Sequence, residues 1–170
     1  MEKKIIINYE DIQSRLKELE KQISSDYADK EPIFIGVLNG VVFFFTDLIK
    51  EVEVPSKIDF IRAASYGADT SSSGSINITK DVEIDIQGKP VIIVEDIVDT
   101  GLTLTKIVEM LQEREPESIR ICTLIDKMER REKMVTIDYY GFRVEEGFLV
   151  GYGLDYDEKY RYLKSIYTLS

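Results

Sequence analysis

The fold is decided by one stretch, Val91-Ile92-Ile93-Val94-Glu95-Asp96-Ile97-Val98-Asp99-Thr100-Gly101. It opens with a continuous run of β-branched residues, which is typical of a buried central strand in a parallel sheet. Carboxylates and a Thr-Gly turn follow this run directly. Because ligands of open parallel sheets bind at the carboxyl ends of the strands, the stretch predicts a binding site at that end.

Outward from this stretch, apolar runs alternate with segments of helical spacing, which indicates an α/β fold with a mainly parallel central sheet flanked by helices. Asn8 is the expected N-cap of the first helix, because Ile12, Leu16, Leu19 and Ile23 follow it at helical spacing. Residues 67–79 are expected to form a loop, which fits a lid and a plain surface loop equally well. The predicted helices are 8–27, 43–50 and 104–113, and the predicted strands are 33–38, 58–62, 91–94, 119–125, 135–139 and 148–150.

Composition narrows the function. The 170 residues predict one domain, and the net charge of −10 disfavours a nucleic-acid-binding surface. The chain has no histidine, which excludes Ser-His and Cys-His catalysis and the usual zinc sites. Acid–base chemistry is therefore expected from Asp, Glu, Lys or Tyr, and oxygen ligation of Mg²⁺ is the favoured metal chemistry.

The chain shows no sign of export. Only three consecutive apolar residues follow Lys3 and Lys4, fewer than a secretory signal needs, and no apolar segment approaches the length of a membrane span. Cys122 lies in an apolar run and is expected to be a buried thiol. We therefore expect a cytoplasmic protein with no membrane partner.

The residues after the central strand combine two kinds of chemistry. Glu95, Asp96 and Asp99 can accept hydrogen bonds from sugar hydroxyls or take up a proton. The turn at residues 100–103 offers backbone N–H groups, hydroxyls and a helix N-terminus, which suit a phosphate monoester. The alternative is an acidic surface turn in which Asp99 or Thr103 merely caps a helix. A nucleotide P-loop and a dinucleotide fingerprint do not match the sequence.

The stretch VIIVEDIVDTGLTL resembles the phosphoribosyl pyrophosphate motif of type I phosphoribosyltransferases, and it is most similar to the hypoxanthine–guanine (6-oxopurine) branch. The resemblance extends from about Ile33 to Arg161. It implies a single type I phosphoribosyltransferase domain over residues 1–170, with a core at about 30–135. A small hood over the purine pocket would come from the N-terminal segment and about 136–170.

The resemblance implies an enzyme of purine salvage. It would use Mg²⁺ and phosphoribosyl pyrophosphate to convert hypoxanthine or guanine to IMP or GMP, with release of pyrophosphate. It also implies a homodimer or homotetramer, and Arg62 or the Phe43–Phe45 cluster could lie near an interface, although core packing is the simpler expectation for those phenylalanines. Alternatives are a xanthine-preferring or adenine transferase, or a nucleotide-sensing regulator on the same fold that binds nucleic acid.

Within the motif, the resemblance implies a role for each residue. Asp99 would be the general base at purine N7, and Glu95 and Asp96 would bind the ribose hydroxyls. The 5′-phosphate would be cradled by Thr100, Gly101, Leu102 and Thr103. The metal would be held by Asp155, Glu95 and Asp96.

Downstream residues would form the purine pocket. By the resemblance, Lys127 donates to O6 of the base and so disfavours adenine, and Phe148 stacks on the base. The backbone at Leu149 would read the edge of the base, beside Asp155. Without the resemblance, Lys127 would be a solvent-facing lysine and Phe148 an ordinary core residue.

Pyrophosphate would be bound by Leu38, Asn39, Gly40 and Arg161, and the family commonly has a non-proline cis peptide in this loop. Ser65 and Tyr66 match the start of a mobile loop that closes over the site. Arg131 would structure the site or an interface. The chain departs from the family pattern at Asn39, where many relatives have lysine, and at Leu102, where some relatives have lysine. The first departure removes a positive charge near the pyrophosphate.

Overall fold

The computed structural model describes residues 1–65 and 76–170. In these residues a six-stranded sheet has the order β4-β3-β2-β5-β6-β7, and a three-stranded sheet has the order β1-β9-β8. The strands are β1 (Lys3–Ile7), β2 (Ile33–Leu38), β3 (Lys57–Ser65), β4 (Ile76–Lys80), β5 (Pro90–Val98), β6 (Ser118–Lys127), β7 (Tyr139–Val144), β8 (Phe148–Val150) and β9 (Ile166–Leu169). The helices are α1 (Tyr9–Asp26), α2 (Val42–Glu51) and α3 (Leu102–Gln112).

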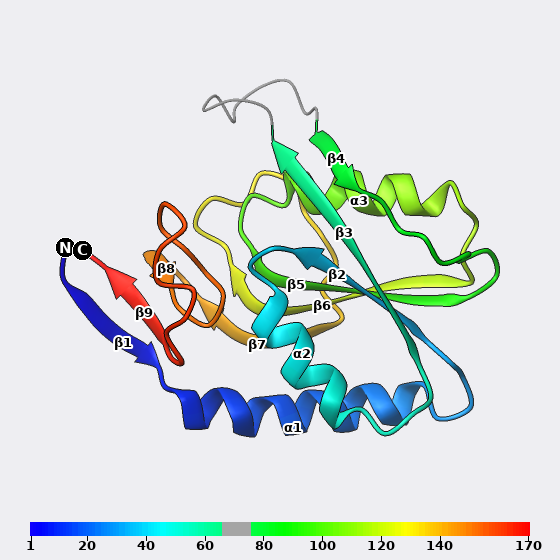
Figure 1. The fold of residues 1–170 in the computed structure, drawn as a ribbon, viewed down its shortest axis with the longest axis horizontal. Coiled ribbons are helices and arrows are strands. Elements are labelled where there is room, and N and C mark those ends of the chain that lie inside the picture. The colour runs from blue at the N-terminus through cyan, green and yellow to red at the C-terminus, as the bar shows by residue number, and fades with distance from the viewer. Residues whose placement is uncertain (66–75) are drawn as a thin grey trace.

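The strand that the sequence predicts at the centre of the sheet, β5, lies between two parallel neighbours in the structure. β5 pairs in parallel with β2 on one side and with β6 on the other. Its side chains alternate between two cores, because successive residues of a strand point to opposite faces. Val91 and Ile93 pack with the apolar side of α3, whereas Ile92 and Val94 pack with α1 and α2. Helices on both faces explain why the run is apolar at every position (Figure 1).

The first helix follows the sequence pattern. The Asn8 side chain accepts a hydrogen bond of 2.8 Å from the backbone N–H of Asp11, so it caps α1 as expected. The residues of the predicted apolar stripe are all buried. Cys122 is also buried, and its thiol is free.

The three-stranded sheet joins the two ends of the chain. β1 and β8 each pair antiparallel with β9, and Glu2 and Ser170 exchange two backbone hydrogen bonds of 3.1 Å. The two termini therefore lie side by side (Figure 1). Among the described residues, no helix combines the length and apolarity needed to cross a membrane.

Three sequence predictions about strands need correction. The strand expected at 135–139 is wrong, because the strand is β7, which begins at Tyr139 and pairs in parallel with β6. The large sheet therefore continues to Val144, beyond the core boundary expected at about 135. Residues 76–79 of the expected loop belong to β4, which pairs antiparallel with β3. β1 and β9 were not predicted, since each is short and gains its regularity from its partner.

The central position of β5 predicts a large cost for truncating it. Ile93 is fully buried, so Ile93→Ala should lower the free energy of unfolding by about 2–5 kcal/mol. Ile58→Ala is the matched control, because Ile58 is 48% exposed on β3, and it should cost less than about 1 kcal/mol. Urea unfolding measures both values, and equal losses would contradict the assignment of the core.

Candidate active site

A cavity of about 260 Å³ opens at the carboxyl end of β5. It gathers residues from β2, β5 and the turn into α3, which are neighbours because parallel strands end at the same edge of a sheet. Seven of the predicted site residues line it: Leu38, Glu95, Asp96, Asp99, Thr100, Gly101 and Thr103. The structure therefore brings together the acidic run, the Thr-Gly turn and the end of β2.

The turn into α3 presents backbone N–H groups. Gly101 is the N-cap, has φ +82°, a conformation that favours glycine, and has no side chain to cap the helix. Only the first helical N–H, that of Leu102, has a side-chain acceptor nearby, the Thr100 hydroxyl at 3.2 Å. A Cβ at Gly101 would lie 2.4 Å from the backbone oxygen of Lys133, which also excludes a side chain there. The alternative in which Asp99 or Thr103 caps the helix is therefore wrong. An uncapped helix N-terminus favours an anion.

Buried Glu95 and half-buried Asp96 form an acidic pair. The Glu95 side chain accepts a hydrogen bond of 3.2 Å from the backbone N–H of Asp96, and the Asp96 side chain accepts one of 2.7 Å from Ile97. Burial, and then the adjacent Asp96 charge, hold the pKa of Glu95 well above its usual range. Burial also raises the pKa of Asp96. This pair is thus costly to keep ionised unless hydroxyls or cations contact it.

Asp99 and Lys127 meet where β5 and β6 end. The Lys127 ammonium lies 3.9 Å from Asp99 Oδ1, and Lys127 is buried. The expectation of a solvent-facing lysine is therefore wrong. Asp99 Oδ1 is buried and has no hydrogen-bond partner, whereas Oδ2 lies 3.4 Å from Arg130. A buried acceptor without a partner is costly, so this oxygen is suited to a donor from a ligand.

Arg131 ties the two strand ends together. Its buried guanidinium pairs with Asp126 at 2.7 Å and donates to the backbone oxygens of Val98, Asp99 and Lys127 at 2.8–3.1 Å. Arg131 thus has a structural role in the site. The following N–H groups, of residues 132 and 133, donate to the Thr100 oxygen.

The loop after β2 packs closely on the acidic pair. The Leu38–Asn39 peptide bond is cis, as the resemblance implied. A Cβ at Gly40 would lie 1.9 Å from Asp96 Oδ2, and one at Gly153 would lie 2.0 Å from the backbone oxygen of Gly40. Glycine at 153 therefore lets the loop approach the segment after β8, and glycine at 40 leaves room for the Asp96 carboxylate.

β8 and the segment after it carry the predicted residues Phe148, Leu149, Asp155 and Arg161. Arg161 donates to the Gly153 oxygen at 2.7 Å and lies 3.5 Å from Asp155. Phe148 is 50% exposed and packs edge-on against Tyr156 with ring centroids 5.6 Å apart. Phe148 is therefore not a core residue, contrary to the simpler expectation, and its ring is accessible to a ligand. Leu149 follows it, buried in β8.

A sequence profile of the phosphoribosyl transferase domain matches residues 7–157. The chain belongs to the phosphoribosyltransferase family. It is 44% identical over 166 residues to the hypoxanthine-guanine phosphoribosyltransferase of Bacillus subtilis, covering 98% of the chain and 92% of that relative. It is 45% identical over 161 residues to the hypoxanthine phosphoribosyltransferase of Salmonella typhimurium, covering 94% and 90%.

Solved structures agree with the family assignment and with the expected fold. A crystal structure of a hypoxanthine-guanine phosphoribosyltransferase from Bacillus anthracis superimposes on this phosphoribosyltransferase with a TM-score of 0.94. The two are 41% identical, and the match covers 98% of each chain. The prediction of a type I phosphoribosyltransferase fold is confirmed.

Two further contacts of this phosphoribosyltransferase were missed from the sequence. Glu129 pairs with Lys127 at 3.2 Å, and Arg130 contacts Asp99. Both residues lie within three positions of Lys127, so closeness in sequence was their only signal. The mobile-loop prediction is largely outside the described residues: Ser65 ends β3, and Tyr66 lies beyond it.

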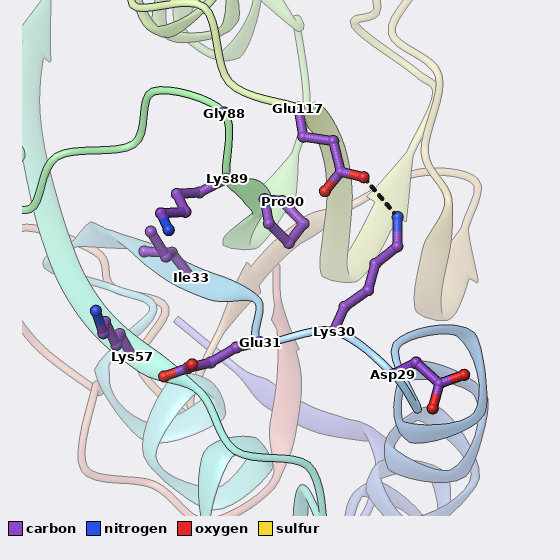
Figure 2. A pocket seen from close by; sticks show the side chains of 9 residues that line it. All are labelled: Asp29, Lys30, Glu31, Ile33, Lys57, Gly88, Lys89, Pro90 and Glu117. Carbon is purple, nitrogen blue, oxygen red and sulfur yellow. Dashed lines mark hydrogen bonds and ion pairs between the residues drawn. The ribbon is translucent and has the colours of Figure 1, made fainter.

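A second cavity, of about 420 Å³, lies at the opposite end of the large sheet (Figure 2). It is near the amino ends of β2, β3 and β5, and its charges are mixed, with a Lys30–Glu117 ion pair of 2.8 Å. Buried side-chain atoms without a partner in the described part of the chain occur at Gln13, Tyr27 and Asp99, and none of them lines this cavity. The motif predicts chemistry at the carboxyl end instead.

The raised pKa of Glu95 predicts that the free energy of unfolding depends on pH. The folded protein holds the Glu95 proton more tightly than the unfolded chain, so stability should fall as pH rises from about 4.5 through the folded-state pKa. Glu95→Gln removes this titration. Urea unfolding measures the free energy of unfolding of the variant and of the parent at each pH. The value for the variant minus that for the parent should be larger at pH 8 than at pH 5.

Glu113→Gln is the control, because Glu113 is an exposed carboxylate at the end of α3. Its effect on the unfolding free energy, measured at both pH values, is the baseline against which the effect of Glu95→Gln is compared. A Glu95→Gln variant that is no more stabilised at pH 8 than at pH 5 would contradict the burial effect.

Proposed function

We propose that this phosphoribosyltransferase transfers the 5-phosphoribosyl group from phosphoribosyl pyrophosphate to hypoxanthine, guanine or both, giving IMP or GMP in purine salvage. The observation that carries the proposal is the juxtaposition of Asp99 and Lys127. One buried carboxylate oxygen lacks a partner, and a buried ammonium lies 3.9 Å from it. An acceptor beside a cation matches the N7–H and O6 edge of a 6-oxopurine.

In the proposed reaction, N9 of the purine bonds to C1′ of the ribose as the bond from C1′ to the pyrophosphate oxygen breaks. The proton on N7 passes to the unpartnered oxygen of Asp99. The carboxylate charge also stabilises the oxocarbenium-like transition state, because it lies where positive charge develops. Lys127 donates to O6, and a 6-amino group would instead present hydrogens to this cation.

The ribose 5-phosphate is assigned to the neighbouring part of the cavity. The uncapped N-terminus of α3 and the hydroxyls of Thr100 and Thr103 suit the phosphate, and Glu95 and Asp96 suit the ribose hydroxyls. The exposed ring of Phe148 is placed to stack on the purine. The loop at residues 38–40 and Arg161 would contact pyrophosphate, with the side chain of Asn39 in place of a charged lysine.

The carboxylates also fit Mg²⁺. In the described residues no three acidic side chains are already gathered to hold a metal. Mg²⁺ binds such sites through one or two carboxylates, water and substrate phosphates, so Asp155, with Glu95 and Asp96, would hold it together with phosphoribosyl pyrophosphate. When bound, the ion neutralises charge on the pyrophosphate.

Two further expectations stay predictions, namely a cytoplasmic location and assembly as a homodimer or homotetramer. For the predicted assembly, the three residues of the Phe43–Phe45 cluster differ in exposure. Phe44 and Phe45 are buried in the core, whereas Phe43 is 42% exposed at the start of α2. Phe43 is thus the member of the cluster available to an interface.

The proposed activity is tested by incubating the purified chain with phosphoribosyl pyrophosphate, Mg²⁺ and an equimolar mixture of radiolabelled hypoxanthine, guanine and xanthine. IMP or GMP should form first. Faster turnover of xanthine would favour the xanthine-preferring alternative. No nucleotide from any of the three bases would refute the proposal.

Asp99→Asn should lower the turnover number by about 10²–10⁴-fold, because the amide cannot accept the N7 proton. Binding of phosphoribosyl pyrophosphate, measured by calorimetry, should change little. Asp29→Asn makes the same chemical change at an exposed position and should leave turnover unaltered. An Asp99→Asn variant as fast as the parent would remove Asp99 as the base.

A further inference from the structure

Lys127 lies between two carboxylates, and the mechanism above uses only one of them. Its ammonium is 3.9 Å from Asp99 Oδ1 and 3.2 Å from Glu129 Oε2. Only 7% of the Lys127 side chain is exposed, whereas 45% of the Glu129 side chain is exposed. Glu129 therefore reaches inward from the surface to contact a buried cation.

The distances from the Lys127 ammonium to Asp99 and to Glu129 correspond to different kinds of contact. A buried ammonium has three N–H donors and needs charged or hydrogen-bonding partners, because water is excluded. The separation of 3.9 Å from Asp99 exceeds hydrogen-bond length, whereas 3.2 Å from Glu129 lies within it. Glu129 is thus the closer anionic partner of Lys127 in the described part of the chain.

The closer contact of Lys127 with Glu129 leaves Asp99 Oδ1 available to accept a proton. Asp99 Oδ1 is buried without a partner, although Lys127 could reach it by a small movement of a flexible side chain. A full ion pair between Lys127 and Asp99 would occupy the oxygen that must accept the N7 proton. It would also turn the ammonium away from the purine O6.

Glu129 is itself anchored. Its Oε2 accepts a hydrogen bond of 3.2 Å from the backbone N–H of Gly147, at the turn just before Phe148. The side-chain contact with Lys127 and the backbone contact at Gly147 lower the pKa of Glu129 from its usual value. One charged oxygen therefore contacts both the ammonium and the turn that leads to the stacking ring.

We propose that Glu129 is a positioning residue that holds Lys127 away from Asp99, so that the base stays free and the ammonium stays directed at the 6-oxo group. The inference deepens the proposed function and rests on it for its kinetic consequences. Its geometric content, the position of the Lys127 ammonium, stands independently of activity.

Glu129→Gln tests the charge, because glutamine can still accept from Gly147 but no longer attracts the ammonium electrostatically. Lys127 should then move to Asp99. We expect the turnover number with hypoxanthine to fall by about tenfold or more, a fraction of the contribution of a general base. The KM for phosphoribosyl pyrophosphate should stay within about twofold, since the phosphate turn is untouched.

Matched variants separate positioning from general damage. Glu146→Gln removes an exposed carboxylate from the same turn and should leave turnover unchanged. Glu129→Asp keeps the charge and should recover part of the activity. In a Lys127→Met background, Glu129→Gln should cause no further loss, because no ammonium remains to be positioned.

Two kinetic results would overturn the inference. The first is a Glu129→Gln turnover number within about twofold of the parent. The second is an equal loss with and without Lys127, which would mean that Glu129 acts only through the Gly147 turn. If the parent chain makes no nucleotide at all, the proposed function fails instead.

A crystal structure of Glu129→Gln decides the geometric claim in either case. The Lys127 ammonium should lie within hydrogen-bond distance of Asp99 Oδ1, shorter than the 3.9 Å of the parent. An unchanged separation would overturn the inference whatever the activity.

Discussion

The buried guanidinium of Arg131 is the contact on which the rest of the site depends. Side-chain exposures of 4% for Arg131 and 8% for Asp126 make their 2.7 Å ion pair a buried one. The same guanidinium donates to backbone oxygens at the ends of both β5 and β6. It therefore fixes the relative position of the two strand ends from which Asp99 and Lys127 project.

The positions of the functional groups follow from the fixed ends of β5 and β6. Because β5 ends beside β6, the acidic run of one strand and the lysine of the other share one small space. The glycines then allow close approach: Gly101 lets the chain turn into α3, and Gly40 and Gly153 let two distant loops meet over Asp96. The acidic pair of buried Glu95 and half-buried Asp96 and the unpartnered Asp99 oxygen lie at an edge of the sheet that ligand groups can reach.

Local patterns made much of this predictable. The β-branched run at Val91 identified the central strand, and the Thr-Gly turn indicated that a helix follows, because each depends on neighbouring residues. The helix, α3, begins at Leu102, two residues before the predicted Leu104. Long-range contacts left no such signal. The burial of Lys127, the exposure of Phe148 and the pairing of β1 with β9 all depend on segments far apart in the chain. The true register of β7 likewise depends on β6 rather than on its own sequence.

The dependence on Arg131 is tested most directly by the unfolding free energy of Arg131→Ala beside that of Arg143→Ala. Both arginines contact Asp126, but Arg143 is 67% exposed and lies 3.5 Å away. Arg131→Ala should cost about 3–5 kcal/mol, because it leaves a buried charge poorly paired. Arg143→Ala should cost about 1 kcal/mol or less. Equal costs for the two variants would contradict the account.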